Sequence, residues 1–347
     1  MESTGSNRHN RRLSQLKTST TGKHRHKHFP VLILAGGGAI PDDKLSAMQT
    51  IGTIEPVPPY RFDLTLDLIS RFPHPTVDVA HDGAYWRVVR VRDELALLRV
   101  SARGDQLLHV VCAASSGPFE RTAALDAIRH ILCTELDLQS FYDYAREQPE
   151  LWRVVQPIVG LRWLRTPSVY EALMTTIIEQ QIAWKMAQRA QRWLVEWAAD
   201  ALEHGGRRYY AFPKPASIAQ ATIDDLTPLK ITFRRMSIMI DLSQRIESGT
   251  LTLERLVQIP VQEAYQVLVA FKGIGHWTAA WTLQRVHGFT NVVGHNDVAL
   301  QAAVNHYYYN GSGRIPEGQV QSTFARYGEF AGLAAHHTIL RWIVDRY

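Results

Sequence analysis

The stretch AFKGIGHWTAAWTLQRV, residues 270–286, combines residue types that can bind a charged ligand. Gly273 and Gly275 flank one isoleucine, and glycine permits positive φ angles and leaves backbone N–H groups unshielded. N–H groups at the start of a helix, together with the helix dipole, attract an anion such as phosphate. The Lys272 ammonium adds a positive charge beside them. A corner between two helices, where glycine only permits close packing, is the alternative that these residues leave open.

Two tryptophans follow the glycines, Trp277 and Trp281. Residues four apart lie on one face of a helix. The electron-rich faces of indole rings attract cations, so the pair predicts a surface that favours an electron-poor, positively charged ring. A plain stripe of core residues is the alternative at the same spacing.

The elements that must position these residues are helices. VQEAYQVLVAF after Pro260 predicts a helix that leads into the glycines, so residues 261–287 are expected to form a helix, a tight hairpin and a second helix. Upstream, Ser168 precedes an apolar helical pattern and Glu171 follows three residues later, which predicts a capping box. Helical periodicity dominates residues 146–347.

Residues 58–145 show a different pattern. The segment 76–113 alternates apolar and polar residues, with turn signals at Asp82-Gly83 and Gly104-Asp105, which predicts an antiparallel sheet. RTAALDAIRHILCTELDL then predicts a helix. The expected fold class is therefore mainly α with an α+β N-terminal domain.

Residues 1–57 are rich in Ser, Thr, Asn, His and basic residues, and we expect a disordered basic leader. A signal peptide, a phosphate-binding glycine loop at AGGG and metal binding by HRHKH are the alternatives. Residues 1–30 carry seven Lys or Arg and one Glu, a charge of +6. The whole chain is +5, which leaves the other 317 residues at −1, so phosphate binding in the folded part would depend on local groups.

The composition excludes several classes of site. Cys112 and Cys133 are the only cysteines, too few for a disulfide scaffold or for a four-cysteine zinc or iron–sulfur site. We expect a reducing, cytoplasmic location. No run of 18 apolar residues is present, so no membrane partner is expected.

LVAFKGIGHWTAAWTLQR followed by NVVGHNDVAL resembles the helix–hairpin–helix superfamily of DNA glycosylases, and within it 3-methyladenine DNA glycosylase II. YEALMTTIIEQQIAWKMA is similar to the family's helix with a Gln-Gln pair. The resemblance covers about residues 58–345, and the order of the sheet, Gln-Gln helix, hairpin and Asp is also similar. It implies a helix–hairpin–helix glycosylase architecture in which Lys272, Gly273 and Gly275 bind DNA phosphate.

The resemblance assigns the catalytic role to Asp297, which lies 22 residues after Gly275. Loss of a base leaves positive charge on the sugar, and a carboxylate about 4 Å away stabilises that charge by about 4 kcal/mol at an effective dielectric of ~20. Asp297 would also orient or deprotonate water. Its alternative is a helix N-cap before VALQAAV.

Other roles follow from the resemblance. Trp277 and Trp281 would line the base pocket, and Gln181, supported by Gln180, would fill the gap left by a flipped base. Relatives that also cut the strand carry a Schiff-base lysine two residues after the second glycine, where Trp277 stands here.

Several positions depart from the family. Lys272 replaces a frequent proline and Glu179 a frequent glycine. Ile339 stands where a pocket tryptophan is expected, and Trp342 lies one turn further on. His295 is expected either to contact the flipped nucleotide or to cap a turn.

The expected function is a monofunctional glycosylase that removes alkylated purines, such as 3-methyladenine or 7-methylguanine, from damaged double-stranded DNA in base excision repair. The alternatives are a glycosylase for deaminated or oxidised bases and a non-enzymatic lesion-binding protein. We expect a monomer without a catalytic metal or cofactor. A structural monovalent cation held by hairpin carbonyls is implied by the resemblance.

Overall fold

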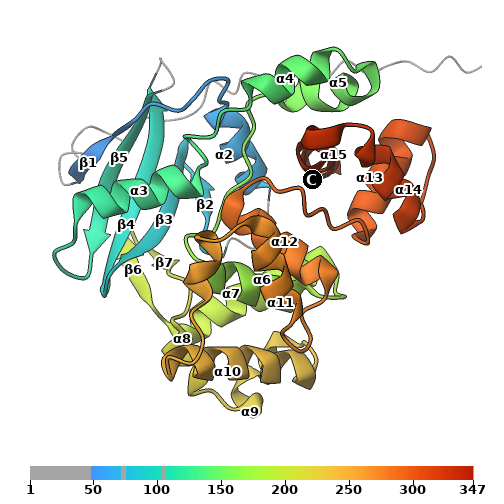
Figure 1. The fold of residues 1–347 in the computed structure, drawn as a ribbon. Helices are drawn as coiled ribbons and strands as arrows, with labels where there is room; N and C mark the ends of the chain where they lie inside the picture. The colour runs from blue at the N-terminus through green and yellow to red at the C-terminus, as the bar shows by residue number, and fades with distance from the viewer. Residues whose placement is uncertain (1–47, 72–75, 104–106, 347) are drawn as a thin grey trace, which may run out of the picture. The chain divides into compact units, whose positions relative to one another are not determined.

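The computed structural model describes residues 48–71, 76–103 and 107–346. An antiparallel sheet near the N-terminal end of this part precedes a larger set of helices (Figure 1), which confirms the predicted fold class. Most of the expected leader, including HRHKH, and the Gly104-Asp105 turn lie outside the described residues. Within the described part, no helix is both long and apolar enough to cross a lipid bilayer.

The sheet has five strands in the spatial order β1-β5-β4-β3-β2, and each neighbouring pair is antiparallel. Asp82 and Gly83 both have positive φ, at 50° and 65°, as the predicted turn between β2 and β3 requires. β1 lies inside the range expected to be leader, yet it pairs with β5, so this end of the range is part of the sheet. The strands are β1 (Gln49–Ile54), β2 (Val79–His81), β3 (Ala84–Val91), β4 (Glu94–Arg103) and β5 (Leu107–Ser115).

Both faces of the sheet are buried. In β4, Ala96 and Leu98 pack on one face against α2 (Phe62–Ser70) and α3 (Arg121–Ile131), while Leu95 and Leu97 pack on the other. The second face is covered by a hairpin of β6 (Ala201–His204) and β7 (Arg207–Tyr210). Helical periodicity dominates the sequence of residues 146–347 and gives no sign of this hairpin. The Gly205-Gly206 pair, with φ of 57° and 75°, is the hairpin turn that the helical pattern concealed.

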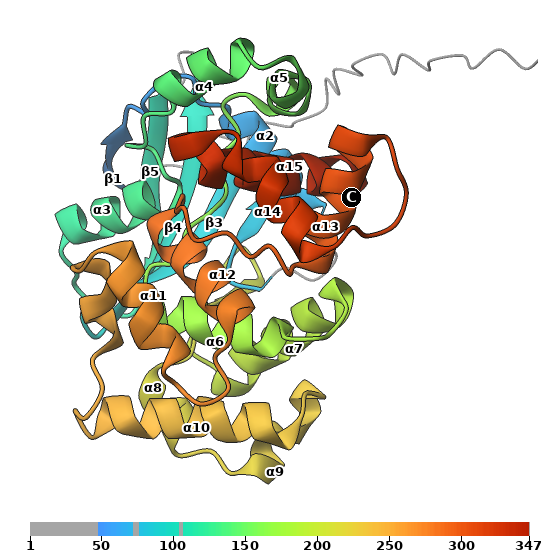
Figure 2. The same ribbon diagram turned by 45° about the vertical axis from the view of Figure 1, so that its right-hand side comes forward.

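The helices from α4 onward pack around two hydrophobic clusters. Figures 1 and 2 show the arrangement of these helices. The first helical lobe contains α6 (Val169–Glu179), α7 (Trp184–Ala198), α8 (Pro215–Ala219), α9 (Ile223–Leu226), α10 (Phe233–Glu247), α11 (Val261–Val269) and α12 (His276–His287). The second helical lobe contains α4 (Gln139–Arg146), α5 (Pro149–Val155), α13 (Val298–Tyr309), α14 (Glu317–Ala325) and α15 (Ala331–Arg346).

The first lobe is inserted into the second along the chain. α4 and α5 precede the first lobe in sequence but pack with α13 and α15 of the second. α4 was expected to belong to the sheet domain that ends at residue 145, but its residues Phe141 and Tyr142 are fully buried in the second lobe. The link from α12 to α13 therefore carries the chain from one lobe to the other.

Helix α6 is the central element of the first lobe. Ser168 is its N-cap and accepts a hydrogen bond from the Glu171 amide at 3.1 Å, as predicted. The Glu171 side chain does not complete a capping box, because the Arg87 guanidinium on β3 donates to both of its carboxylate oxygens at 2.7 and 2.8 Å. Arg87 also binds Asp78 at 2.9 Å. This buried ion pair joins the sheet to the first lobe.

We predict that Glu171→Gln lowers the free energy of unfolding by about 3 kcal/mol, because it leaves the buried Arg87 charge without its bidentate partner. Urea denaturation measures the change. Glu120→Gln, at the exposed pair with Arg92, is the control and should leave the midpoint unchanged. A Glu171→Gln midpoint equal to that of the wild type would show that the pair does not hold the sheet to the lobe.

Candidate active site and nucleic-acid interface

The hairpin between α11 and α12 lies where the sequence predicts it. Gly273 has φ +91°, a left-handed conformation that glycine favours. Gly275 has φ −94° and an extended backbone, so only Gly273 of the two glycines uses a positive φ. Gly275 is the N-cap of α12 and no side chain caps this end, which leaves first-turn N–H groups available to an anion. Gly275 and Lys272 are exposed, and their role in phosphate binding stays a prediction.

The Gln-Gln pair lies beside this hairpin. The Gln180 amide donates to the Gly273 carbonyl oxygen at 3.2 Å and to the Thr278 hydroxyl at 2.9 Å. Gln181 is exposed and has φ +52°, so its side chain projects from a left-handed turn. The Arg235 guanidinium of α10 donates to the Gln180 carbonyl oxygen and fixes the same turn. Gln180 thus holds the turn that carries Gln181 against the hairpin. The insertion of Gln181 into the gap left by a flipped base stays a prediction.

Sequence reasoning missed Phe233, the first residue of α10. Its side chain is 67% exposed, although it lies only two residues before Arg235 and therefore near the Gln181 turn. An exposed aromatic ring beside this turn is available for stacking on a DNA base. The sequence showed only an aromatic residue at a helix start, and nothing in its spacing separated it from a core residue.

Asp297 lies in the link between the two lobes and is 8% exposed. Its Oδ1 accepts hydrogen bonds from the Ala299 and Leu300 amides, both at 2.8 Å, so Asp297 is the N-cap of α13. Its Oδ2 accepts from the indole N–H of Trp277 at 2.7 Å and of Trp281 at 3.2 Å. The structure thus brings together all three residues for which the sequence predicted chemistry.

The donors to Asp297 are all neutral. No ion pair of Asp297 occurs among the residues that the structure describes. The α13 dipole places partial positive charge at the carboxylate without a full counter-charge. A buried carboxylate held in this way can stabilise positive charge that develops next to it.

The two indoles converge rather than stack. Their ring centroids lie 6.5 Å apart and their planes are tilted by 56°. Both rings are half-buried. The two indoles lie on one face of α12, as predicted. A ring bound here would stack on one indole and meet the other at an angle.

Helix α12 is fixed behind the indoles by a second buried ion pair. Arg285 binds Glu179 of α6 at 2.7 Å and the Thr176 hydroxyl at 2.8 Å. Gln191 donates to the other Glu179 oxygen at 2.8 Å. Glu179, which replaces a frequent glycine of the family, is therefore a tie between α6, α7 and α12.

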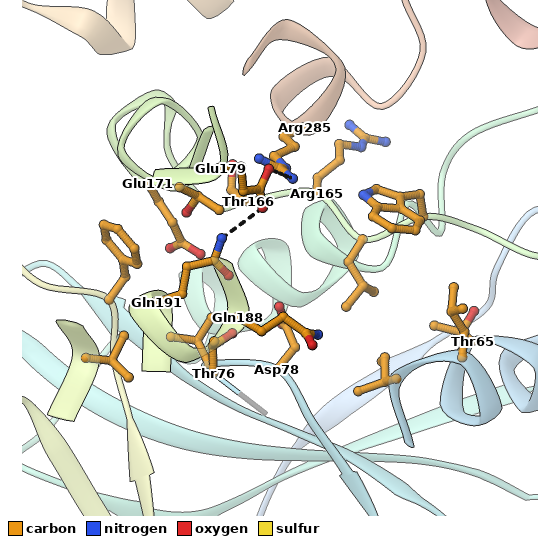
Figure 3. A pocket seen from close by; sticks show the side chains of 18 of the residues that line it. Thr65, Thr76, Asp78, Arg165, Thr166, Glu171, Glu179, Gln188, Gln191 and Arg285 are labelled. Atoms are coloured by element: carbon orange, nitrogen blue, oxygen red, sulfur yellow. Dashed lines mark hydrogen bonds and ion pairs between the residues drawn. The ribbon is translucent and has the colours of Figure 1, made fainter. Parts of the chain in front are cut away.

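A cavity of about 130 Å³ adjoins this tie. Its labelled side chains come from α2, from the segment before β2, from the loop before α6, and from α6, α7 and α12 (Figure 3). Glu171 and Glu179 are each paired with an arginine there, so the polar groups are largely satisfied by one another. Asp297, Trp277 and Trp281 do not line it.

A smaller recess of about 30 Å³ is lined by Trp281, Gly294 and Leu300, each of which is hydrogen-bonded to Asp297, although Asp297 itself does not line it. Ile339, at the family's tryptophan position, lines it. Trp342 does not, because it packs against His306 and Tyr307 and under the Arg346 guanidinium. Trp342 therefore does not replace the expected pocket tryptophan.

His295 lies two residues before Asp297. Its amide donates to the Val293 carbonyl oxygen at 2.9 Å, and its ring stacks on His276 at 6.3 Å. Burial, and the nearby His276 in second place, lower the pKa of His295, so its ring is neutral at pH 7. The backbone bond fits the turn-capping alternative.

Comparison with known proteins finds similarity to DNA glycosylases. No family model matches the chain. The DNA-3-methyladenine glycosylase of Bacillus subtilis (strain 168) is 27% identical over 247 residues, which cover 70% of this chain and 82% of that protein. The 3-methyladenine DNA-glycosylase from Archaeoglobus fulgidus shares the fold with a TM-score of 0.73 and 23% identity, covering 85% of this chain and 98% of that one.

The fold is shared more widely. The 8-oxoguanine glycosylase/lyase of Clostridium acetobutylicum in its apo form has a TM-score of 0.65 and 17% identity, covering 85% of this chain and 98% of that one. These findings confirm the resemblance to the helix–hairpin–helix DNA glycosylases and support a glycosylase of base excision repair. Within that superfamily, the chain resembles 3-methyladenine DNA glycosylase II.

We predict that Asp297→Ala lowers the free energy of unfolding by about 1–2 kcal/mol, because α13 loses its N-cap. Thermal or urea unfolding measures the loss. Asn296→Ala, at the exposed neighbouring position, should leave stability unchanged. Equal stability of Asp297→Ala and the wild type would mean that the cap does not hold α13 in place.

Proposed function

We propose that this protein hydrolyses the N-glycosidic bond of alkylated purines in duplex DNA and leaves the strand uncut. The observation that carries the proposal is the Asp297 carboxylate, held by four neutral donors with both indoles in contact. A sugar docked at this carboxylate gains about 4 kcal/mol for a charge ~4 Å away at an effective dielectric of ~20. That energy corresponds to about a thousandfold in rate.

The indoles favour alkylated bases as substrates. Methylation at N3 or N7 places positive charge on a purine and weakens its bond to the sugar. Either Trp277 or Trp281 presents its electron-rich face to such a ring, and this cation–π attraction is absent for a neutral base. Because the bond to an alkylated base is already weakened, the Asp297 carboxylate needs to stabilise only the positive charge that develops on the sugar.

The absence of an amine at position 277 supports cleavage of the base alone. A strand-cutting reaction through a Schiff base needs a nucleophilic lysine near the sugar. Position 277 holds an indole that is bonded to Asp297. The exposed Lys272 lies on the hairpin, where its charge suits a phosphate.

The DNA would lie across the hairpin and the Gln181 turn. The uncapped start of α12 offers N–H groups to a phosphate, and Gln181 and Phe233 are the exposed side chains that could enter a flipped-out base's place. A structural monovalent cation would have to share the Gly273 carbonyl oxygen with the Gln180 amide.

We predict that Asp297→Asn lowers base release from methylated duplex DNA by a hundredfold or more, because the amide carries no charge to stabilise the sugar. DNA affinity should change by less than a few-fold. Chromatography of released bases and alkali-dependent strand cleavage measure both activities.

The same experiment tests the reaction type. Strand nicking by the wild-type protein without alkali would contradict base excision alone. Release of deaminated or oxidised bases, but no methylated ones, would favour a glycosylase of different scope. DNA binding without any base release would favour a lesion-binding protein.

We predict that Trp281→Ala weakens excision of positively charged methylpurines at least tenfold more than excision of neutral hypoxanthine. Trp281→Phe is the matched variant, because it keeps an aromatic face but loses the N–H bond to Asp297. It should slow both reactions by similar factors. Single-turnover rates decide the point, and equal losses for both bases in Trp281→Ala would exclude a cation-attracting ring.

A further inference from the structure

Some of the residues that line the recess near Asp297 are also hydrogen-bonded to Asp297. Trp281 and Leu300 each donate a hydrogen bond to Asp297, and the Gly294 carbonyl oxygen accepts one from the Asp297 amide at 2.8 Å. A base stacked on Trp281 with its sugar at Asp297 would therefore place one edge at the recess. The residues of the recess wall that such an edge would approach include Trp281, Gln284, Gly294, Leu300, His336 and Ile339.

His336 is a buried polar residue in this wall, at 4% exposure. The Gln284 amide nitrogen of α12 is hydrogen-bonded to the Gly288 carbonyl oxygen and to His336 Nδ1. The carbonyl needs an N–H donor, which fixes the orientation of the amide. The second N–H then points at Nδ1, so Nδ1 is the acceptor and the proton of the neutral ring is on Nε2.

That Nε2–H has no hydrogen-bond partner among the residues that the structure describes. Burial lowers the pKa of His336 well below its ordinary value, and the ring remains neutral. The other side-chain N–H donors of the wall are used, because Trp281 donates to Asp297 and Gln284 donates twice. A buried donor without an acceptor is costly and selects a ligand that supplies one.

The size of the recess limits what can enter. The recess, of about 30 Å³, has room for a water molecule or for an exocyclic atom on the edge of a base. Ile339 closes the apolar side, and a tryptophan there would compete for the same space. The acceptor that fits is a carbonyl oxygen on the edge of a purine, because an exocyclic amino group would present donors to a donor.

We propose that His336 is a specificity-determining residue whose Nε2–H donates to the C6 carbonyl oxygen of an extruded purine. It favours 6-oxopurines, such as 7-methylguanine and hypoxanthine, over 6-aminopurines such as 3-methyladenine. This inference rests on the proposed base-excision function and adds the class of base that the site selects.

The test uses the full chain and one duplex DNA treated with a methylating agent, which contains both 7-methylguanine and 3-methyladenine. The rate constants for release of the two bases from the same DNA give a ratio that does not depend on enzyme concentration. In His336→Leu this ratio should fall at least tenfold, through slower 7-methylguanine release with 3-methyladenine release nearly unchanged. His336→Gln keeps an N–H donor and should recover part of the ratio.

His337→Leu is the matched control. His337 is also fully buried, but its Nδ1 is bonded to the Leu333 carbonyl oxygen and it does not line the recess. The ratio should stay at the wild-type value in this variant. Equal losses for both bases in His336→Leu, or an unchanged ratio, would overturn the proposal. Wild-type protein that releases neither base would instead refute the underlying base-excision function.

Gln284→Leu tests the same inference without replacing the histidine. It removes the donor that holds the proton on Nε2, so the ratio should again fall. If His336→Leu loses its cooperative thermal unfolding, this variant decides the outcome. A folded Gln284→Leu protein with a wild-type ratio would overturn the role of the fixed tautomer.

Discussion

The Asp297 carboxylate, shared between the start of α13 and two indoles of α12, is the interaction on which the site depends. α12 belongs to the first helical lobe and α13 to the second. One side chain therefore caps a helix of one lobe while it accepts hydrogen bonds from a helix of the other. The position of the catalytic candidate and the relation between the lobes are fixed by the same four bonds.

For both indoles to reach the Asp297 carboxylate, α12 must keep a fixed position. A buried ion pair holds α12 against α6. The pair between Arg285 and Glu179 lies two turns from Trp277, and Gln180 binds the hairpin at the opposite end. Removing two charges from water is expensive, and only good geometry with further hydrogen bonds offsets that cost. Thr176 and Gln191 supply such bonds. The charges thus favour one relative position of α6 and α12 over other packings of the same apolar surfaces.

Local signals in the sequence predicted the elements well. The helix–hairpin–helix over residues 261–287, the Ser168 cap and the Asp82-Gly83 turn depend on neighbouring residues, and the structure contains each of them. The grouping of Asp297 with the tryptophans was expected only through the resemblance to a family. Spacing along the chain does not show which helix face meets a residue 20 positions away.

The features that the sequence did not predict depend on contacts between distant segments rather than on neighbouring residues. Glu171 matched a capping box, but Arg87, 84 residues earlier, provides a stronger partner for its carboxylate. β1 was included in a polar leader because its pairing with β5 is not visible in its own composition. His336 gave no signal, because a histidine on a buried helix face looks like an ordinary core residue until the proton on its ring is assigned.

The tilt of the indoles constrains how the site can select a base. Both N–H groups must point at a single oxygen, so rings attached four residues apart on one helix converge and cannot lie parallel. A base that enters can therefore stack on only one of the indoles. The hydrogen bonds to Asp297 prevent the two rings from lying parallel on both sides of a cationic base. Charge attraction through one face is weak and not sensitive to the edge of the base. Discrimination among charged purines must therefore come from contacts at the edge, where the recess wall carries an unused donor.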